Sequence, residues 1–234
     1  RAAVRRRHDA GFADHPPSPM PPHVWTTITH LGNSMLLVPV ALVLALWLLA
    51  GGQRRRATVW ALAFGAAVLL VLGSKLAFLG WGIGSAALDF TGISGHATLA
   101  TAVLTLGAWL PVAHRGPRVQ AAGLAVGLAL GVLVGWSRLV LHAHTPSEVV
   151  AGCTLGALAA LAPVAWPRRP AQALPHRWLP LALGAALLLL PQAGRPAEAH
   201  GLVVRMALAL SGRDAVYRRA MLHHPAPRAR MPAA

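Results

Sequence analysis

The chain has 234 residues, of which 56% are hydrophobic and only 12% are charged, and its mean hydropathy is +0.55. A soluble domain of this size carries about twice that charged fraction, so the composition excludes an ordinary soluble globular protein. The net charge of +15 comes mainly from arginines in the tails and short loops. No recognition helix or aromatic stacking motif accompanies these arginines, so nucleic acid is not an expected partner.

The first 23 residues are polar and rich in proline, which predicts a flexible, basic N-terminal arm over residues 1–23. Six apolar segments follow, and each is close to the ~20 residues that a helix needs to cross a bilayer. They cover residues 31–50, 57–79, 95–112, 119–141, 147–166 and 178–194. The alternating polarity of a barrel is absent, and only helices then satisfy their own backbone in lipid. We therefore predict an all-α, polytopic membrane helical bundle of about six transmembrane helices, with its domain at residues 24–196.

Two segments flank these predicted spans. Residues 25–34 are interpreted as an interfacial helix that precedes the first span. Residues 197–234 are predicted to form a basic C-terminal tail, whose apolar stretch at 202–210 is too short to cross the membrane. The eight tryptophans fall near the ends of predicted spans, which is typical of a belt at the membrane interface.

Arginines in the short loops predict the orientation. They follow the first, third and fifth spans, at positions 54–56, 115 and 118, and 168, 169 and 177. The positive-inside rule places these loops in the cytoplasm and the loops after the second and fourth spans on the opposite side. Both basic ends of the chain disagree with this topology. A missing upstream span would explain the arm, and a sixth segment that does not cross would return the tail to the cytoplasm.

The segment from Ser137 to Glu148 places an arginine, two histidines and a carboxylate between two apolar runs. Charged groups near a bilayer are costly, so they indicate a functional site. A histidine can act as a nucleophile or general acid near neutral pH, and a carboxylate four residues after His144 can hold its second ring nitrogen. Glu148 also completes the capping box Thr145-Pro146-Ser147-Glu148, so a purely structural role in helix capping is the alternative.

Two further groups are expected on the same side as His144. Ser94-Gly95-His96 begins the third span, where free N–H groups can bind an anion and Gly95 lets a phosphate approach the backbone. The alternative is that Ser94 only caps the helix. Lys75, the only lysine in the chain, lies near the outer end of the second span. Its alternative is a lysine that extends toward the membrane surface.

These motifs resemble the type 2 phosphatidic acid phosphatase superfamily, which includes lipid phosphatases, glucose-6-phosphatase and vanadium haloperoxidases. The family pattern is Lys-x6-Arg-Pro, then Pro-Ser-Gly-His, then Ser-Arg-x5-His-x3-Asp, and the resemblance covers about residues 75 to 152. This chain has Ile93 in place of the proline and Glu148 in place of the aspartate. Gly82 and Ile83 stand where the family has Arg-Pro. Backbone N–H groups of residues 80–84 are the expected substitute for this missing arginine.

The resemblance implies a two-step hydrolase that uses no metal or other cofactor. His144 would attack phosphorus and form a phosphohistidine, Glu148 would orient His144, and His96 would protonate the leaving group. The implied phosphate-binding residues are Lys75, Ser94, Gly95 and Arg138.

We therefore expect a multi-pass enzyme of the cell (inner) membrane that hydrolyses a lipid phosphate or lipid pyrophosphate, with its active site facing the periplasm or exterior. One alternative is a non-enzymatic lipid-phosphate-binding or transport protein that retains the fold, because a phosphate-binding arginine is missing. A second alternative is a haem or metal protein that uses His96, His142 and His144, since facing histidines on membrane helices can ligate haem.

Overall fold

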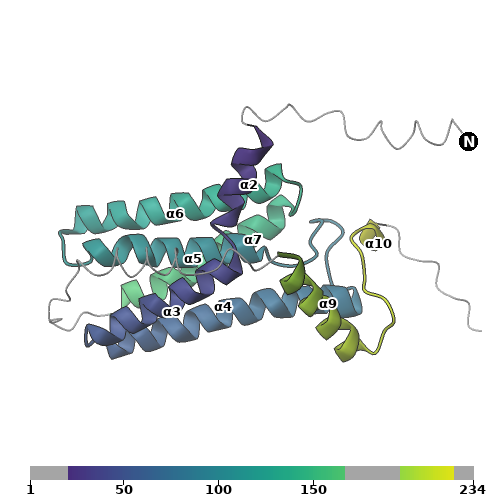
Figure 1. Cartoon of the computed structure of the whole chain (residues 1–234), viewed down its shortest axis with the longest axis horizontal. Coiled ribbons are helices and arrows are strands. Elements are labelled where there is room, and N and C mark those ends of the chain that lie inside the picture. The colour runs from purple at the N-terminus through teal and green to yellow at the C-terminus, as the bar shows by residue number, and fades with distance from the viewer. Residues whose placement is uncertain (1–20, 167–195, 224–234) are drawn as a thin grey trace, which may run out of the picture.

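The computed structural model describes residues 21–166 and 196–223, and Figure 1 shows a bundle of long helices with α9 and α10 at one end. The long helices are α3 (Ser34–Ala50), α4 (Arg54–Trp81), α5 (Gly95–Trp109), α6 (Pro117–Val140) and α7 (Pro146–Ala165). The remaining elements are α2 (Pro22–His30), a 3-10 turn (Leu110–Val112), α9 (Pro196–Ser211) and α10 (Ala220–His223). Within the described residues, extended pairing is limited to an isolated bridge between Ser85 and Phe90.

Five stretches of the described chain are long and apolar enough to cross a membrane. They are His23–Ala50, Arg54–Trp81, Gly95–Val112, Pro117–Val140 and Pro146–Ala165. The prediction of an all-α, polytopic helical bundle is confirmed, and the first five predicted spans each match one of these stretches. The sixth predicted span, at 178–194, lies outside the described residues.

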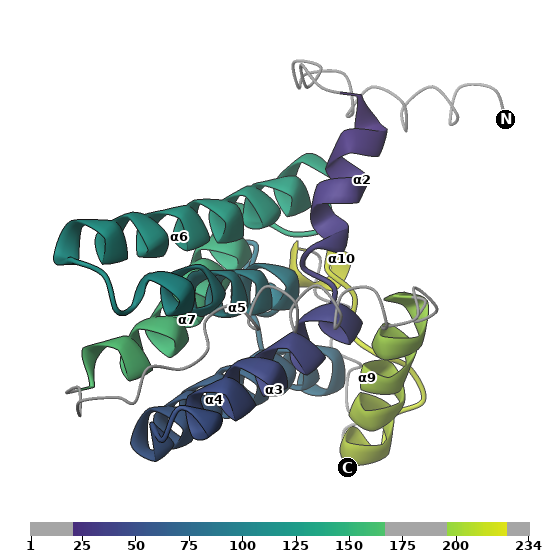
Figure 2. The ribbon, with the colours of Figure 1, turned by 60° about the vertical axis from the view of Figure 1, so that its left-hand side comes forward.

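Helix α2 is set at a steep angle to α3, as Figure 2 shows, after the turn at residues 31–33. The side chain of Asn33 caps α3 by accepting a hydrogen bond of 3.0 Å from the backbone N–H of Met35. The predicted interfacial helix is therefore a separate helix, and it packs against α6 through a buried face that includes Trp25. This packing places α2 beside the end of the bundle where α6 stops and α7 begins.

Helix α5 forms the centre of the bundle and packs against α3, α4, α6 and α7. Ten of its fifteen residues are buried. Glycines let the neighbouring helices approach closely, because a Cβ atom at Gly127 or Gly131 of α6, or at Gly156 of α7, would overlap with α5. Small residues are typical of helix contacts in membranes, where close packing drives association.

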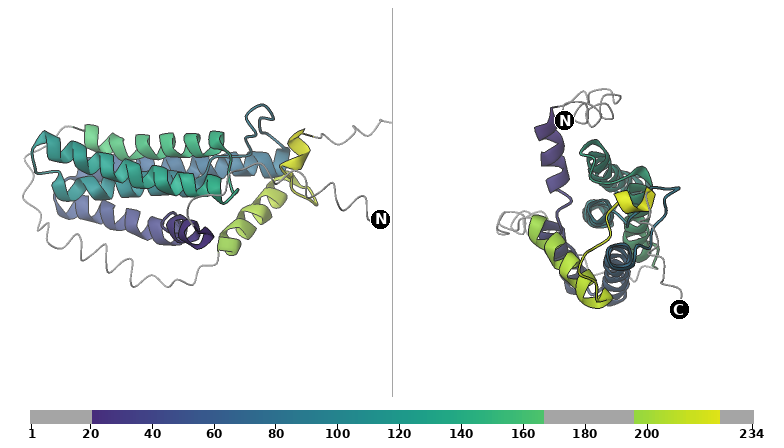
Figure 3. Two further views of the ribbon diagram at one scale, coloured as in Figure 1. Left: turned by 90° about the horizontal axis from the view of Figure 1, so that it is seen from above. Right: turned by 90° about the vertical axis from the view of Figure 1, so that its right-hand side faces the viewer.

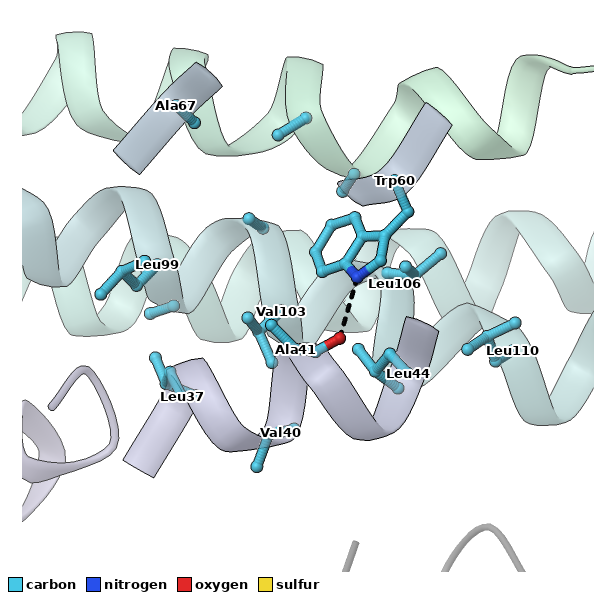
Figure 4. Close-up of a cluster of buried hydrophobic side chains, with 14 of the residues drawn as sticks. Leu37, Val40, Ala41, Leu44, Trp60, Ala67, Leu99, Val103, Leu106 and Leu110 are labelled. Atoms are coloured by element: carbon cyan, nitrogen blue, oxygen red, sulfur yellow. Dashed lines mark hydrogen bonds between the residues drawn. The ribbon is translucent and has the colours of Figure 1, made fainter. Parts of the chain in front are cut away.

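Two of the tryptophans are core residues rather than members of an interfacial belt. Trp60 and Trp109 are each 1% exposed. In Figure 4, Trp60 lies among apolar side chains of α3 and α5, and its Nε1 donates a 3.0 Å hydrogen bond to the carbonyl oxygen of Ala41. A buried indole N–H needs such an acceptor. The large exposed side chains on the outer faces are mostly aliphatic and include Leu42, Leu46, Leu62, Leu69 and Leu158. Trp81, Trp136 and Trp166 are also exposed, and they lie near helix ends as a belt requires.

The described part of the C-terminal tail folds back onto the bundle. Helix α9 packs against α4, with Ala207 fully buried. Residues 212–223, which we call the C-terminal strap, then run to α10 at the same end of the bundle as the loop after α4, as Figure 3 shows. This position contradicts the explanation in which the sixth predicted segment does not cross and the tail returns to the side of the arginine-rich loops.

Candidate active site

The seven residues predicted for the site lie at one end of the bundle. Helices α4 and α6 run toward this end, and they carry Lys75 and Arg138 near their C-termini. Helices α5 and α7 begin at this end, so the other predicted residues lie at their first turns or just before them. These residues are Ser94, Gly95 and His96 at α5, and His144 and Glu148 at α7. The alternation of helix directions thus brings residues from four helices together.

His144 and Glu148 form a hydrogen-bonded pair. The Nδ1 atom of His144 lies 2.6 Å from Oε2 of Glu148, and the glutamate side chain is fully buried while that of His144 is 14% exposed. An ionised carboxylate can only accept, so Nδ1 carries the proton and Nε2 of the neutral ring keeps its lone pair. Burial lowers the pKa of His144, and the nearby charges of Lys75 and Arg138 act in the same direction, against the opposing effect of Glu148. The neutral imidazole, the form with a lone pair on Nε2, is thereby favoured.

Glu148 has both of the roles between which the sequence left a choice. The capping box at the start of α7 is formed, and Oε2 accepts from the backbone N–H of Thr145 at 3.3 Å while it holds His144. The other oxygen, Oε1, accepts from the backbone N–H and the hydroxyl of Thr91, at 2.7 and 2.6 Å. Such complete hydrogen bonding stabilises a buried carboxylate in its charged form.

Lys75, Ser94 and Gly95 create a corner suited to an anion. A Cβ atom added to Gly95 would lie 3.9 Å from Nζ of Lys75, so the ammonium lies over the start of α5. The hydroxyl of Ser94 is fully buried, makes no capping hydrogen bond, and has no hydrogen-bond partner among the described residues. The first turn of a helix also has N–H groups without intrahelical acceptors. A phosphate oxygen would satisfy these donors.

Arg138 and His96 complete the predicted set. Nη1 of Arg138 donates to the hydroxyl of Thr29 in α2 at 2.9 Å, while its buried Nε has no acceptor in the described part of the chain. Half-buried His96 interacts electrostatically with Arg138, Lys75 and His144. The two histidines and the two cations therefore belong to one cluster.

His142 lies in the turn before His144, where its backbone has a positive φ of 51°. This turn lets the N–H of His144 reach the carbonyl oxygen of Arg138 at 3.3 Å. Within residues 21–166 and 196–223, no group of three or more His, Cys, Asp or Glu side chains is arranged to hold a metal ion.

The glycine-rich segment that replaces the first family motif is not a free anion-binding nest. Gly82 ends α4 with a left-handed backbone, at φ +69°. Its N–H donates to Phe78 at 2.8 Å, and the N–H of Ile83 donates to Ala77 at 3.2 Å. The first of these is the bond from C′ to C3 that defines the αL type of helix end, so both N–H groups are already used within the chain. The expectation that these N–H groups replace the missing arginine is therefore wrong for Gly82 and Ile83.

Sequence reasoning missed Arg219, which reaches the candidate site from the C-terminal strap. Its Nη2 donates to Oε1 of Glu148 at 2.8 Å and to the hydroxyl of Thr91 at 3.0 Å. Its Nη1 donates to the backbone oxygen of Asp89 at 2.6 Å and lies 3.0 Å from a carboxylate oxygen of the same residue. Arg219 is 71 residues from Glu148 and belongs to no local motif, so no sequence signal pointed to this contact.

Comparisons with known proteins agree with this geometry. Residues 80–171, which include the Ser-Gly-His motif and the segment from Ser137 to Glu148, match the PAP2 superfamily. A protein of Klebsiella pneumoniae, described as an uncharacterized 22.5 kDa protein in the cps region, is 38% identical over 206 residues. This alignment covers 86% of the present chain and 99% of the relative. No solved structure gives a significant match.

Proposed function

The chain belongs to the PAP2 superfamily, and from this premise we propose that it is an integral membrane phosphatase for a lipid phosphate or lipid pyrophosphate. The superfamily generally comprises phosphatases, so membership supports the hydrolysis of a phosphoester without specifying the substrate. The observation that carries the proposal is the buried His144–Glu148 pair, at 2.6 Å, beside the two cations Lys75 and Arg138. A nucleophile with its orienting carboxylate thus lies next to groups that attract a phosphate.

In the first step, Nε2 of His144 attacks phosphorus, and a P–N bond forms as the P–O bond to the leaving group breaks. The Nδ1 proton stays in the hydrogen bond to Glu148, which stabilises the positive ring that results. His96 donates a proton to the departing oxygen. The charge on the equatorial phosphate oxygens is met by Lys75, Arg138, and the start of α5 with Ser94 and Gly95.

In the second step, water attacks the phosphohistidine and His96 takes a proton from that water. The P–N bond breaks, its electron pair returns to Nε2 of His144, and inorganic phosphate leaves. The two steps restore both histidines to their starting forms. The proposed cycle needs only groups supplied by this chain and water.

We further propose that the protein lies in the cell (inner) membrane, with its site facing the periplasm or exterior. The exposed Arg54, Arg55, Arg115 and Arg118 support this orientation, because they lie at the end of the bundle opposite to His144. The acyl or prenyl chains of the substrate would remain among lipids, and its phosphate would enter the site at the membrane boundary.

The test is phosphate release by the purified, detergent-solubilised protein. A suitable panel contains a phosphatidate, a polyprenyl monophosphate and a polyprenyl pyrophosphate. We expect release from at least one of these lipids, and a loss of at least about 10³-fold in His144→Ala. Equal release by the wild type and His144→Ala would overturn the mechanism.

A non-enzymatic lipid-phosphate-binding or transport protein is the second candidate, and Gly82 favours it because an arginine that binds phosphate is missing there. Saturable binding of the same lipids without phosphate release would support this candidate. Turnover that depends on His144 would exclude it.

A further inference from the structure

The C-terminal strap is docked against the candidate site by contacts that the proposed function does not use. The N–H of Tyr217 donates a 2.9 Å hydrogen bond to the carbonyl oxygen of Leu79, at the end of α4. The ring of Tyr217 covers Gly82, where an added Cβ atom would lie 2.8 Å from Cε1 of the ring. Leu222 similarly approaches Gly84. The absence of side chains at Gly82 and Gly84 therefore makes room for the strap.

Docking brings one guanidinium to two carboxylates. Arg219 has ion-pair distances of 2.8 Å to Glu148 and 3.0 Å to Asp89. A carboxylate oxygen of Asp89 also accepts a hydrogen bond of 3.0 Å from Nε2 of His223, so Asp89 holds the strap at two positions. Nη1 donates to the backbone oxygen of Asp89 and forms an ion pair with its carboxylate, and Nη2 donates to Thr91 and Glu148. These contacts leave the two terminal nitrogens of Arg219 committed to the protein rather than to a phosphate.

The contact of Arg219 with the charged Glu148 affects the protonation of His144. A fully buried carboxylate needs a compensating positive charge, and His144 and Arg219 are both in hydrogen-bond contact with it. Were His144 the only compensating group, Glu148 would favour the imidazolium form, which has no lone pair on Nε2. An arginine remains charged across the physiological pH range. It can therefore balance Glu148 while His144 stays neutral.

We propose that Arg219 is a positioning residue that acts through Glu148, keeping His144 neutral with its Nε2 free to attack. The strap is then part of the catalytic unit, and residues 212–223 are required for full activity near neutral pH. This inference rests on the proposed function, because it assigns the strap a role in the same phosphoryl transfer.

The principal experiment is the pH dependence of phosphate release in Arg219→Gln, Arg219→Lys and the control Arg218→Gln, whose arginine is exposed on the same strap. Removal of the positive charge stabilises imidazolium, so the acid limb of kcat/KM should move upward by about one pH unit in Arg219→Gln. Arg219→Lys keeps the charge and should restore most of this shift, while Arg218→Gln should match the wild type. KM should change little, because the proposed phosphate ligands remain.

A purely structural role for Arg219 predicts a different result. Loss of folded protein would reduce kcat by the same factor at every pH and leave the acid limb in place, which would overturn the inference. A failure of Arg219→Lys to restore the limb, with its fold intact by melting temperature, would also overturn it.

A second measurement separates this inference from the proposed function. Diethyl pyrocarbonate reacts with neutral imidazole, so mass spectrometry of the His144 peptide across the same pH series reports its protonation without turnover. The His142→Gln background leaves one histidine in that peptide. A midpoint that rises in Arg219→Gln supports the inference even if no lipid in the panel is hydrolysed. An unchanged midpoint overturns it even if the wild type is active.

Discussion

The two ends of the bundle each hold an arginine in a defined place, but they use it differently. Arg56, at the end away from the site, is 4% exposed, donates to oxygens of Gln53 and Trp166, and lies over the ring of Trp109. Arg219, at the site end, has a side chain that is 36% exposed and contacts two carboxylates. The first joins the starts and ends of helices through neutral oxygens and an aromatic ring. The second contacts Asp89 and the carboxylate that holds His144.

This difference predicts that stability and activity can be separated by position. Disruption at the Arg56 end should lower the stability of the bundle and leave the chemistry of folded molecules intact. Disruption at the Arg219 end should change the chemistry, because the carboxylate that Arg219 contacts also holds His144.

The largest effect on activity within this comparison is expected from Glu148→Gln. The amide keeps the shape of the side chain but removes its charge, and it can present an N–H to His144 and stabilise the wrong tautomer. We expect kcat for phosphate release to fall by about 10³- to 10⁴-fold, by analogy with the carboxylate of a catalytic triad. Glu148→Asp retains the charge and serves as the control. An activity of Glu148→Gln equal to that of the wild type would show that the pair at 2.6 Å has only a capping role.

The matching change at the other end is Arg56→Met, which removes the charged group and retains part of the apolar stem. Two hydrogen bonds from a buried guanidinium are lost, so we expect the free energy of unfolding to fall by about 2 kcal/mol. Thermal unfolding in detergent measures this loss, and kcat per folded molecule should stay at the wild-type value. The exposed neighbour Arg55→Met is the control. A stable Arg56→Met protein with reduced kcat would break the contrast between the two ends.

The sequence predicted the spans because runs of apolar residues directly report the length of helix that lipid requires. It also predicted the residues that gather around His144, because all of them except Lys75 belong to short motifs at helix ends. Hydropathy does not say which face of a helix is inside, so Trp60 and Trp109 were assigned to an interfacial belt although both are buried. For the same reason Arg56 was treated only as a loop charge.

The strap could not be predicted because its contacts join distant parts of the chain. The contact between Arg219 and Glu148 depends on the path of α9 and on the space above Gly82, and neither follows from local spacing. The glycines at 80–84 were correctly noticed, but the physical reason for them was misassigned. Gly80 lies close to α9, while Gly82 and Gly84 lie against the strap, as backbone surfaces without side chains.

Gly82→Ala tests whether the docked strap tunes the site. The left-handed backbone at φ +69° disfavours alanine by about 1 kcal/mol, and the new Cβ would meet the ring of Tyr217. We expect residues 212–223 to become more accessible to protease and the acid limb of kcat/KM to rise in the same direction as in Arg219→Gln. Gly65→Ala is the matched control. Gly65 lies on the same helix, α4, and its added Cβ atom would face open space. Increased protease cleavage without a shift of the acid limb would separate docking from chemistry.

The smallest expected effect is a shift in the midpoint of the acid limb of kcat/KM in the wild type, relative to an ordinary histidine. Burial lowers the pKa of His144, so the acid limb of kcat/KM should have its midpoint below the ordinary histidine value of about 6.5. The sign follows from the nucleophile: below the pKa the ring is protonated and cannot attack, and activity rises as pH increases through the pKa. Initial rates at low lipid concentration between about pH 4.5 and 8 measure this midpoint. A midpoint above the ordinary value would mean that the attraction of Glu148 for the imidazolium outweighs burial, Lys75 and Arg138. In that case Arg219 would not balance the carboxylate, and the two ends of the bundle would differ only in exposure.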